Sequence, residues 1–185
     1  MEATHLKTAQ PLIRTFTGKM VHPCSPRPDE IDIDDIAHSL SQQCRFLGHT
    51  DAFYSVAQHS VLVSQVVPAA DAIWGLLHDA ARAYLSDLPA PIKQAPQMWF
   101  YRTSEALLAR AIARRFGLLP EAPESVKHAD KVILATEFRD VTTVIDLDWI
   151  VAECGAAPLP DMLILPCPSA VAEERFMRRF WELTR

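Results

Sequence analysis

Proline outnumbers glycine in this chain by fourteen to five. Proline interrupts helices, and glycine supplies the tight turns that hairpins need, so this ratio favours helices separated by prolines over a sheet of hairpins. Apolar residues such as Ile36, Ala37, Leu40 and Cys44 recur at spacings of three and four, which is helical periodicity. We therefore predict an all-α, compact helical fold with a short irregular or weakly stranded N-terminal arm.

Each predicted helix has boundary signals in the sequence. Ser55 and Ser169 are expected to cap the second and the last helix, and Gly117 to end the fourth. Strand patterns are limited to residues 15–20, where Thr17-Gly18-Lys19 favours a turn, and to residues 162–165. The predicted helices span residues 34–46, 56–67, 70–85, 103–116, 124–139 and 169–181.

The length and hydrophobic content suit one core. A chain of 185 residues that is 49% hydrophobic can bury a single sizeable interior. We predict one domain over residues 1–185, with an arm (1–30), a helical core carrying the site (31–140), and a return with a closing helix (141–185).

Composition also narrows the location and the partners. No apolar run approaches the roughly 18 residues of a membrane span, and no secretory signal is visible. The four cysteines lack metal-site or disulfide spacing, which favours reduced thiols and a cytoplasmic protein without a membrane partner. The net charge of −5 argues against a specific nucleic-acid partner.

Two clusters have open interpretations. Arg110, Arg114 and Arg115 form a basic edge on the predicted fourth helix, either a solvated face or a contact with an acidic partner. Trp99-Phe100-Tyr101 is interpreted as core or as a subunit contact in a homo-oligomer, in preference to a lid that stacks on a base.

The main chemical feature is His78-Asp79 within an apolar segment (residues 74–81). Burying an imidazole beside a carboxylate is costly unless the two pair with each other or hold a cation. His59 lies on an apolar face of the preceding helix, and the two helices are expected to be antiparallel neighbours. Each of these histidines alone is compatible with a hydrogen-bonded core residue.

Asp130 completes the candidate set. Its neighbours one turn on, Ile133 and Leu134, belong to a buried stripe, although a solvated Asp130 paired with Lys127 or Lys131 is the alternative. Two imidazoles and two carboxylates suit one divalent transition metal ion (Mn, Co, Fe, Ni or Zn) and leave coordination positions open for water and substrate.

The order His59, His78-Asp79 and Asp130 resembles the H…HD…D signature of the HD-domain metal-dependent phosphohydrolases. The surrounding sequence is similar to the branch that contains the bacterial 5′-deoxynucleotidases and small phage-type deoxynucleoside triphosphate hydrolases. The similarity extends over about residues 10–140 and is carried by residues 33–40, 44–46, 54–60, 76–81 and 84–93.

The resemblance implies an HD-domain fold and hydrolysis of phosphate ester or anhydride bonds of nucleotides, deoxynucleotides in particular. His59, His78, Asp79 and Asp130 would then ligate the metal. Arg45 would approach the substrate phosphate, as a guanidinium fork can. Phe46 takes the place of a tryptophan that presses on the sugar. Asp87 matches an aspartate near the sugar and the attacking water, or it caps its own turn.

One position departs from the family pattern, because Arg82 stands where a catalytic glutamate is usual. A guanidinium is not a general base. Metal-activated hydrolysis with help from Asp87 is one interpretation, with Arg82 gripping a polyphosphate. A protein that binds metal and nucleotide with little or no catalysis is the second. In the third, Arg82 faces solvent and another acid, such as Glu137, takes over.

Overall fold

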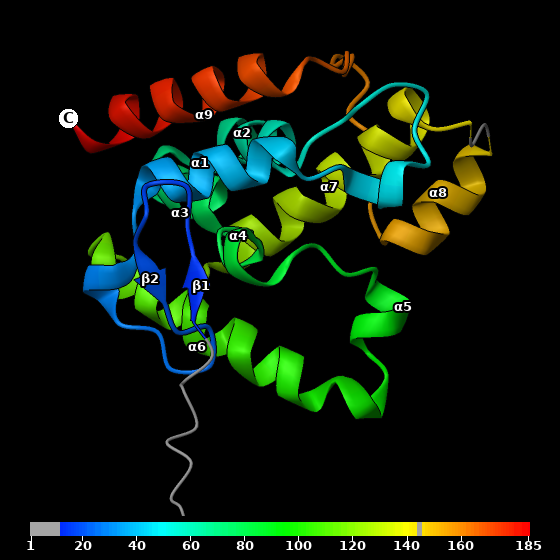
Figure 1. The fold of residues 1–185 in the computed structure, drawn as a ribbon. Coiled ribbons are helices and arrows are strands. Elements are labelled where there is room, and N and C mark those ends of the chain that lie inside the picture. The colour runs from blue at the N-terminus through cyan, green and yellow to red at the C-terminus, as the bar shows by residue number, and fades with distance from the viewer. Residues whose placement is uncertain (1–11, 144–145) are drawn as a thin grey trace, which may run out of the picture.

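A computed structural model describes residues 12–143 and 146–185 of the chain. The described chain is mostly helical, with one small antiparallel hairpin in which Ile13 pairs with Val21 and Arg14 with Met20 (Figure 1). The elements are β1 (Ile13–Arg14), β2 (Met20–Val21), α1 (Ile33–Gln42), α2 (Val56–Val66), α3 (Ala72–Leu77), α4 (Arg82–Leu85), α5 (Ala90–Lys93), α6 (Trp99–Arg115), α7 (Glu124–Val141), α8 (Leu147–Cys154) and α9 (Ser169–Thr184). The predicted all-helical class is confirmed.

Capping side chains begin three of the helices. Asp32 accepts from the backbone N–H of Asp34 at the start of α1, and Asp146 accepts from that of Trp149 at the start of α8. The predicted cap Ser55 accepts from the N–H of Gln58 at the start of α2. These bonds satisfy amide donors that a helix leaves unpaired in its first turn. The Ser169 prediction is wrong, because Pro168 occupies the cap position and Ser169 is already helical.

The helix predicted over residues 70–85 is interrupted. A 3₁₀ turn over Ala69–Asp71 precedes α3, and α3 ends at Leu77. From there the backbone tightens, with the N–H groups of Ala80 and Arg82 bonded three residues back, to the carbonyls of Leu77 and Asp79. Such tightened turns mark local constraint, and this one carries His78 and Asp79.

Other helices are shorter or longer than predicted. The first helix ends at Gln42 instead of residue 46, and a 3₁₀ turn over Arg45–Gly48 follows, in which Phe46 and Leu47 have left-handed backbone angles (φ 52° and 54°). Helix α6 begins at Trp99 instead of residue 103, and α7 and α9 extend to Val141 and Thr184. Helices α5 and α8 were not predicted. Residues 162–165 form no strand, and the predicted 15–20 strand is mostly the turn of the hairpin, where Gly18 has φ 87°.

The core lies between α1, α2, α3 and α9. Helix α9 crosses over α1 and α2, and α7 lies on another side of α2 (Figure 1). The fully buried side chains there include Ile36, Leu40, Leu76 and Phe176. No helix within the described ranges is long and apolar enough to cross a membrane.

Helices α2 and α3 approach each other closely at Gly75. A Cβ built on Gly75 would lie 2.9 Å from the Ser64 Cα, closer than packed atoms allow. The absence of a side chain at this position therefore sets the spacing of the two helices that carry His59 and His78.

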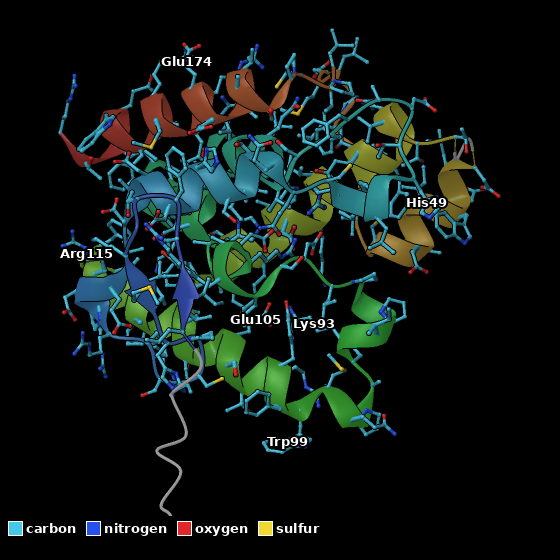
Figure 2. The ribbon with its side chains drawn as sticks, in the orientation of Figure 1. His49, Lys93, Trp99, Glu105, Arg115 and Glu174 are labelled. Carbon is cyan, nitrogen blue, oxygen red and sulfur yellow. The ribbon has the colours of Figure 1, made fainter. Side chains whose placement is uncertain are left out.

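The aromatic cluster at the start of α6 is not core. Trp99 and Phe100 are 62% and 55% exposed, and Figure 2 shows Trp99 projecting from the outer side of α6. The corner before it is held instead by Arg102, whose guanidinium donates to the carbonyls of Lys93 and Ala95. The core interpretation is therefore wrong for Trp99 and Phe100, and the subunit-contact interpretation stays a prediction. Arg110 and Arg114 are exposed, as a solvated face requires.

Candidate functional site

Side-chain nitrogen and oxygen atoms from α2, from α7 and from the turn after α3 converge in one place. His59 Nε2 lies 3.2 Å from His78 Nε2, 3.7 Å from Asp79 Oδ2 and 3.1 Å from Asp130 Oδ1. His78 Nε2 lies 3.4 Å from Asp79 Oδ2 and 3.8 Å from Asp130 Oδ1. Ligands that share one ion at about 2.0–2.2 Å are themselves separated by about 3–4 Å, and the two imidazole nitrogens have this spacing from each other and from each carboxylate.

The local folds explain this convergence. His59 projects from the first turns of α2, the residues 78 and 79 stand where α3 ends, and Asp130 projects from α7. His59 and Asp79 are buried, whereas the Asp130 side chain is 43% exposed. The cluster therefore has a closed inner side and an outer side that solvent can reach.

Each imidazole is fixed by a hydrogen bond on its other nitrogen. His59 Nδ1 donates to Glu137 Oε1 at 2.6 Å, and His78 Nδ1 donates to the Gly75 carbonyl at 2.8 Å. These bonds favour the tautomers that present bare Nε2 lone pairs to the cluster. Two such nitrogens and two carboxylate oxygens facing one another are all acceptors, an arrangement that is costly without a proton or a cation among them.

Asp79 Oδ2 is one of the buried polar atoms of the described chain that lack a hydrogen-bond partner. It is buried, and within the described chain no group makes a well-directed hydrogen bond to it, although Arg82 lies close. Its ligand atom and those of His59 and His78 lie within 4.8 Å of one another. Imidazole nitrogens and carboxylate oxygens together fit a borderline divalent transition metal.

Glu137 supports the cluster from the inside. This fully buried carboxylate also accepts from Arg45 Nη2 at 2.7 Å and from the Tyr54 hydroxyl at 2.8 Å. Burial raises the pKa of Glu137, but Arg45 and His59 outweigh it and hold the pKa below its usual value. Both oxygens of Glu137 already accept hydrogen bonds. Glu137 therefore holds its neighbours in place and is not the free acid of the third interpretation.

The same network shifts the pKa values of His59 and Tyr54. Burial and the charge on Arg45 lower the pKa of His59, but Glu137 and Asp130 outweigh them, and the net direction is upward. Burial, together with the Glu137 charge, raises the pKa of Tyr54 well above its usual value, so the phenol stays a hydrogen-bond donor. Tyr54 was not predicted as a site residue. The signal that could have found it is its position directly before Ser55, the cap of the helix that carries His59.

Arg82 points into the site. Its Nη1 lies 2.8 Å from Asp79 Oδ2 and 3.1 Å from Asp87 Oδ1. The interpretation in which Arg82 faces solvent is therefore wrong. Asp87 pairs with Arg82 instead of capping its own turn, and it follows Ser86, whose φ of 69° is unusual for a residue other than glycine.

Of the two predicted substrate residues, Arg45 lies at the inner edge of the site, and Phe46 lies beside Arg45. Arg45 is buried, with Nη1 3.9 Å from Asp79 Oδ2. Phe46 packs edge-on against Phe138 of α7 and lies beside the Arg45 guanidinium. Consecutive left-handed residues are rare outside functional or tightly constrained sites, and here they set the direction of Phe46.

The sequence was compared with known proteins. No protein-family model matches it. The chain is 42% identical over 173 residues to the uncharacterized protein YfdR of Escherichia coli (strain K12), covering 93% of this chain and 95% of that protein. It is 36% identical over 127 residues, 64% of each chain, to the uncharacterized protein RCAP_rcc00048 of Rhodobacter capsulatus. On this similarity over nearly its whole length, the chain belongs to the family of YfdR.

Proposed function

We propose that this protein is an HD-domain phosphohydrolase that uses one divalent transition metal ion (Mn, Co, Fe, Ni or Zn) to cleave phosphate ester or anhydride bonds of nucleotides, deoxynucleotides in particular. The observation that carries the proposal is the convergence of His59 from α2, His78 and Asp79 from the turn after α3, and Asp130 from α7, with both Nδ1 atoms occupied elsewhere. A set of bare donor atoms open on one side is the arrangement a hydrolytic metal site needs.

The residues around the cluster have separable roles in this proposal. A bound divalent ion would polarise a phosphoryl oxygen and lower the pKa of an attacking water. Arg82 and the Nη1 of Arg45 would neutralise charge on the phosphate, because both guanidinium groups lie beside Asp79. Asp87 is the carboxylate left to orient the water, since Glu137 is buried and fully engaged.

A second candidate function is metal and nucleotide binding without efficient turnover. It is favoured by Arg82, which brings a cation to the position where a general base would act. Loss of a general base typically lowers the rate by about 10²–10⁴-fold, so a weak enzyme is the intermediate case.

The location and the oligomeric state that we propose rest on the cysteines and on an exposed aromatic pair. The four cysteines are free, as suits a cytoplasmic protein that acts on a small-molecule nucleotide. The exposed Trp99 and Phe100 on α6 are the contact we propose for a homo-oligomer.

The test is product release from a panel of deoxy- and ribonucleotides by metal-free protein reconstituted with Mn, Co, Ni or Zn. Turnover that requires both the metal and His78, with His78→Ala as the blank, would support the enzyme. Metal binding without turnover would favour the second candidate, and Arg82→Glu should then gain activity. Failure to bind any of these metals would refute both.

A further inference from the structure

Arg82 is held with one edge of its guanidinium unused. Both of its ion pairs, to Asp79 Oδ2 and to Asp87 Oδ1, are made by the same atom, Nη1. Neither its Nε nor its Nη2 makes a hydrogen bond within the described chain, and neither atom is a buried unsatisfied group. The side chain is 19% exposed, so an edge with parallel N–H donors remains open to a ligand beside the cluster.

That open edge has the geometry of a phosphate receptor. A guanidinium donates two parallel charge-assisted hydrogen bonds to two oxygens of a phosphate, which a lysine or an amide does not reproduce. The edge is also pre-oriented, since Asp87 holds Nη1, and the loop that carries Asp87 is itself anchored by the Tyr101 hydroxyl on the Ser86 carbonyl at 2.7 Å.

The inner contact of Arg82 conflicts with metal binding. Asp79 Oδ2, the atom that pairs with Arg82 at 2.8 Å, also lies 3.7 Å from His59 Nε2 and 3.4 Å from His78 Nε2. An ion on that oxygen would repel the guanidinium beside it, and Arg45 at 3.9 Å adds a second positive charge. A phosphate that accepts from Arg82 would relieve this repulsion and would bring its own negative charge to the ion.

We propose that Arg82 binds a phosphate group of the substrate and that, through Arg82, phosphate and metal bind cooperatively. Arg82 exchanges Asp79 for the phosphate while Asp87 keeps it in place. The inference rests on the proposed function for the metal site. Because coupling between two ligands is reciprocal, each ligand must raise the affinity for the other by the same factor.

The probes are Co²⁺ and inorganic pyrophosphate, with binding followed by calorimetry and by the visible spectrum of the bound cobalt. The variants are Arg82→Gln, Arg82→Lys and, as a matched control on an exposed face of α6, Arg110→Gln. For Arg82→Gln we expect opposite changes: tighter Co²⁺ binding without pyrophosphate, and about tenfold weaker pyrophosphate binding to the cobalt-loaded protein. Arg82→Lys should bind pyrophosphate with intermediate affinity, and Arg110→Gln should behave as the parent.

Pyrophosphate affinity that does not depend on Arg82, or Co²⁺ affinity that falls in Arg82→Gln, would overturn the inference. It would also remove Arg82 from the proposed phosphate contacts, but it would leave the proposed metal-dependent hydrolysis standing. A wild-type protein that binds no Co²⁺ would overturn both. Reciprocal coupling through Arg82 in a protein that cleaves no nucleotide would support the inference and count against only the proposed activity.

Discussion

At the scale of single residues, Glu137 is the side chain on which the site depends most. It is fully buried and accepts hydrogen bonds from Arg45, Tyr54 and His59. Glu137→Gln keeps the volume but leaves Arg45 as a buried charge without its partner. Breaking such a pair costs about 3–5 kcal/mol, and losing an outer partner of a ligating histidine lowers metal affinity by about 10–100-fold. Denaturant unfolding and metal titration measure the two effects.

A matched control separates this prediction from a general loss of negative charge. Glu182→Gln removes a carboxylate that is 53% exposed on α9 and should change neither quantity measurably. A Glu137→Gln protein with parental stability would show that the buried network contributes little to the fold.

The cluster residues could be predicted from the sequence because apolar helix faces single them out and the resemblance to the H…HD…D signature joins them into one site. His59 and Asp130 lie on apolar faces of helices that the spacing of hydrophobic residues reveals. The inward direction of Arg82 is also local, because its partners Asp79 and Asp87 lie within five residues of it. The engagement of Glu137 depends on side chains up to 92 residues away, and no local pattern encodes it.

At the scale of elements, Gly75 sets the distance between α2 and α3. We predict that Gly75→Ala destabilises the protein by about 1–3 kcal/mol, because the added methyl group meets the Ser64 backbone at 2.9 Å and the helices must separate. Metal affinity should fall as well, since His59 lies on α2 and His78 directly follows α3. Thermal unfolding and metal titration test this, with Gly117→Ala as a contrast: nothing lies within 4 Å of its added methyl group, so its cost is that of the strained backbone alone.

The element boundaries show which signals were available in the sequence. Helix α8 has an Asp146 cap and a left-handed Gly155 at its end, so ordinary boundary signals could have found it. The interruption after Leu77 has no such signal. It coincides with the hydrogen bond from His78 to Gly75 and with the close approach to α2, both of which exist only in the folded chain.

For the whole molecule, a ligand that binds only the folded state must stabilise it. We expect each metal that binds the cluster to raise the free energy of unfolding, by about 2.7 kcal/mol at a free concentration one hundred times Kd. Differential scanning calorimetry with and without chelator measures the change. His78→Ala should show no metal-dependent shift, and an equal shift in that variant would place the binding elsewhere.

Acid should weaken the fold through carboxylates that the folded chain keeps ionised. Burial raises the pKa of Asp140, but hydrogen bonds from Arg139 and from the backbone N–H of Ile164 outweigh it, and the net pKa is lowered. The resulting stability is fully present above the unfolded value of about 3.9 and is lost as the pH falls below it. Denaturant unfolding of metal-free protein between about pH 5.5 and pH 3 measures the slope. Asp140→Asn should flatten it, and the exposed Asp161→Asn should not.

The position of α9 has a consequence for how the chain is made. This helix covers α1, α2 and α3, although it follows them by roughly a hundred residues. A ribosome therefore synthesises every proposed metal ligand well before α9. The side chains of α9 that cover the apolar faces of the earlier helices include Phe176 and Phe180. Until residues 169–184 leave the ribosome, the apolar faces of α1, α2 and α3 stay exposed. Chaperones and proteases compete for chains in that state.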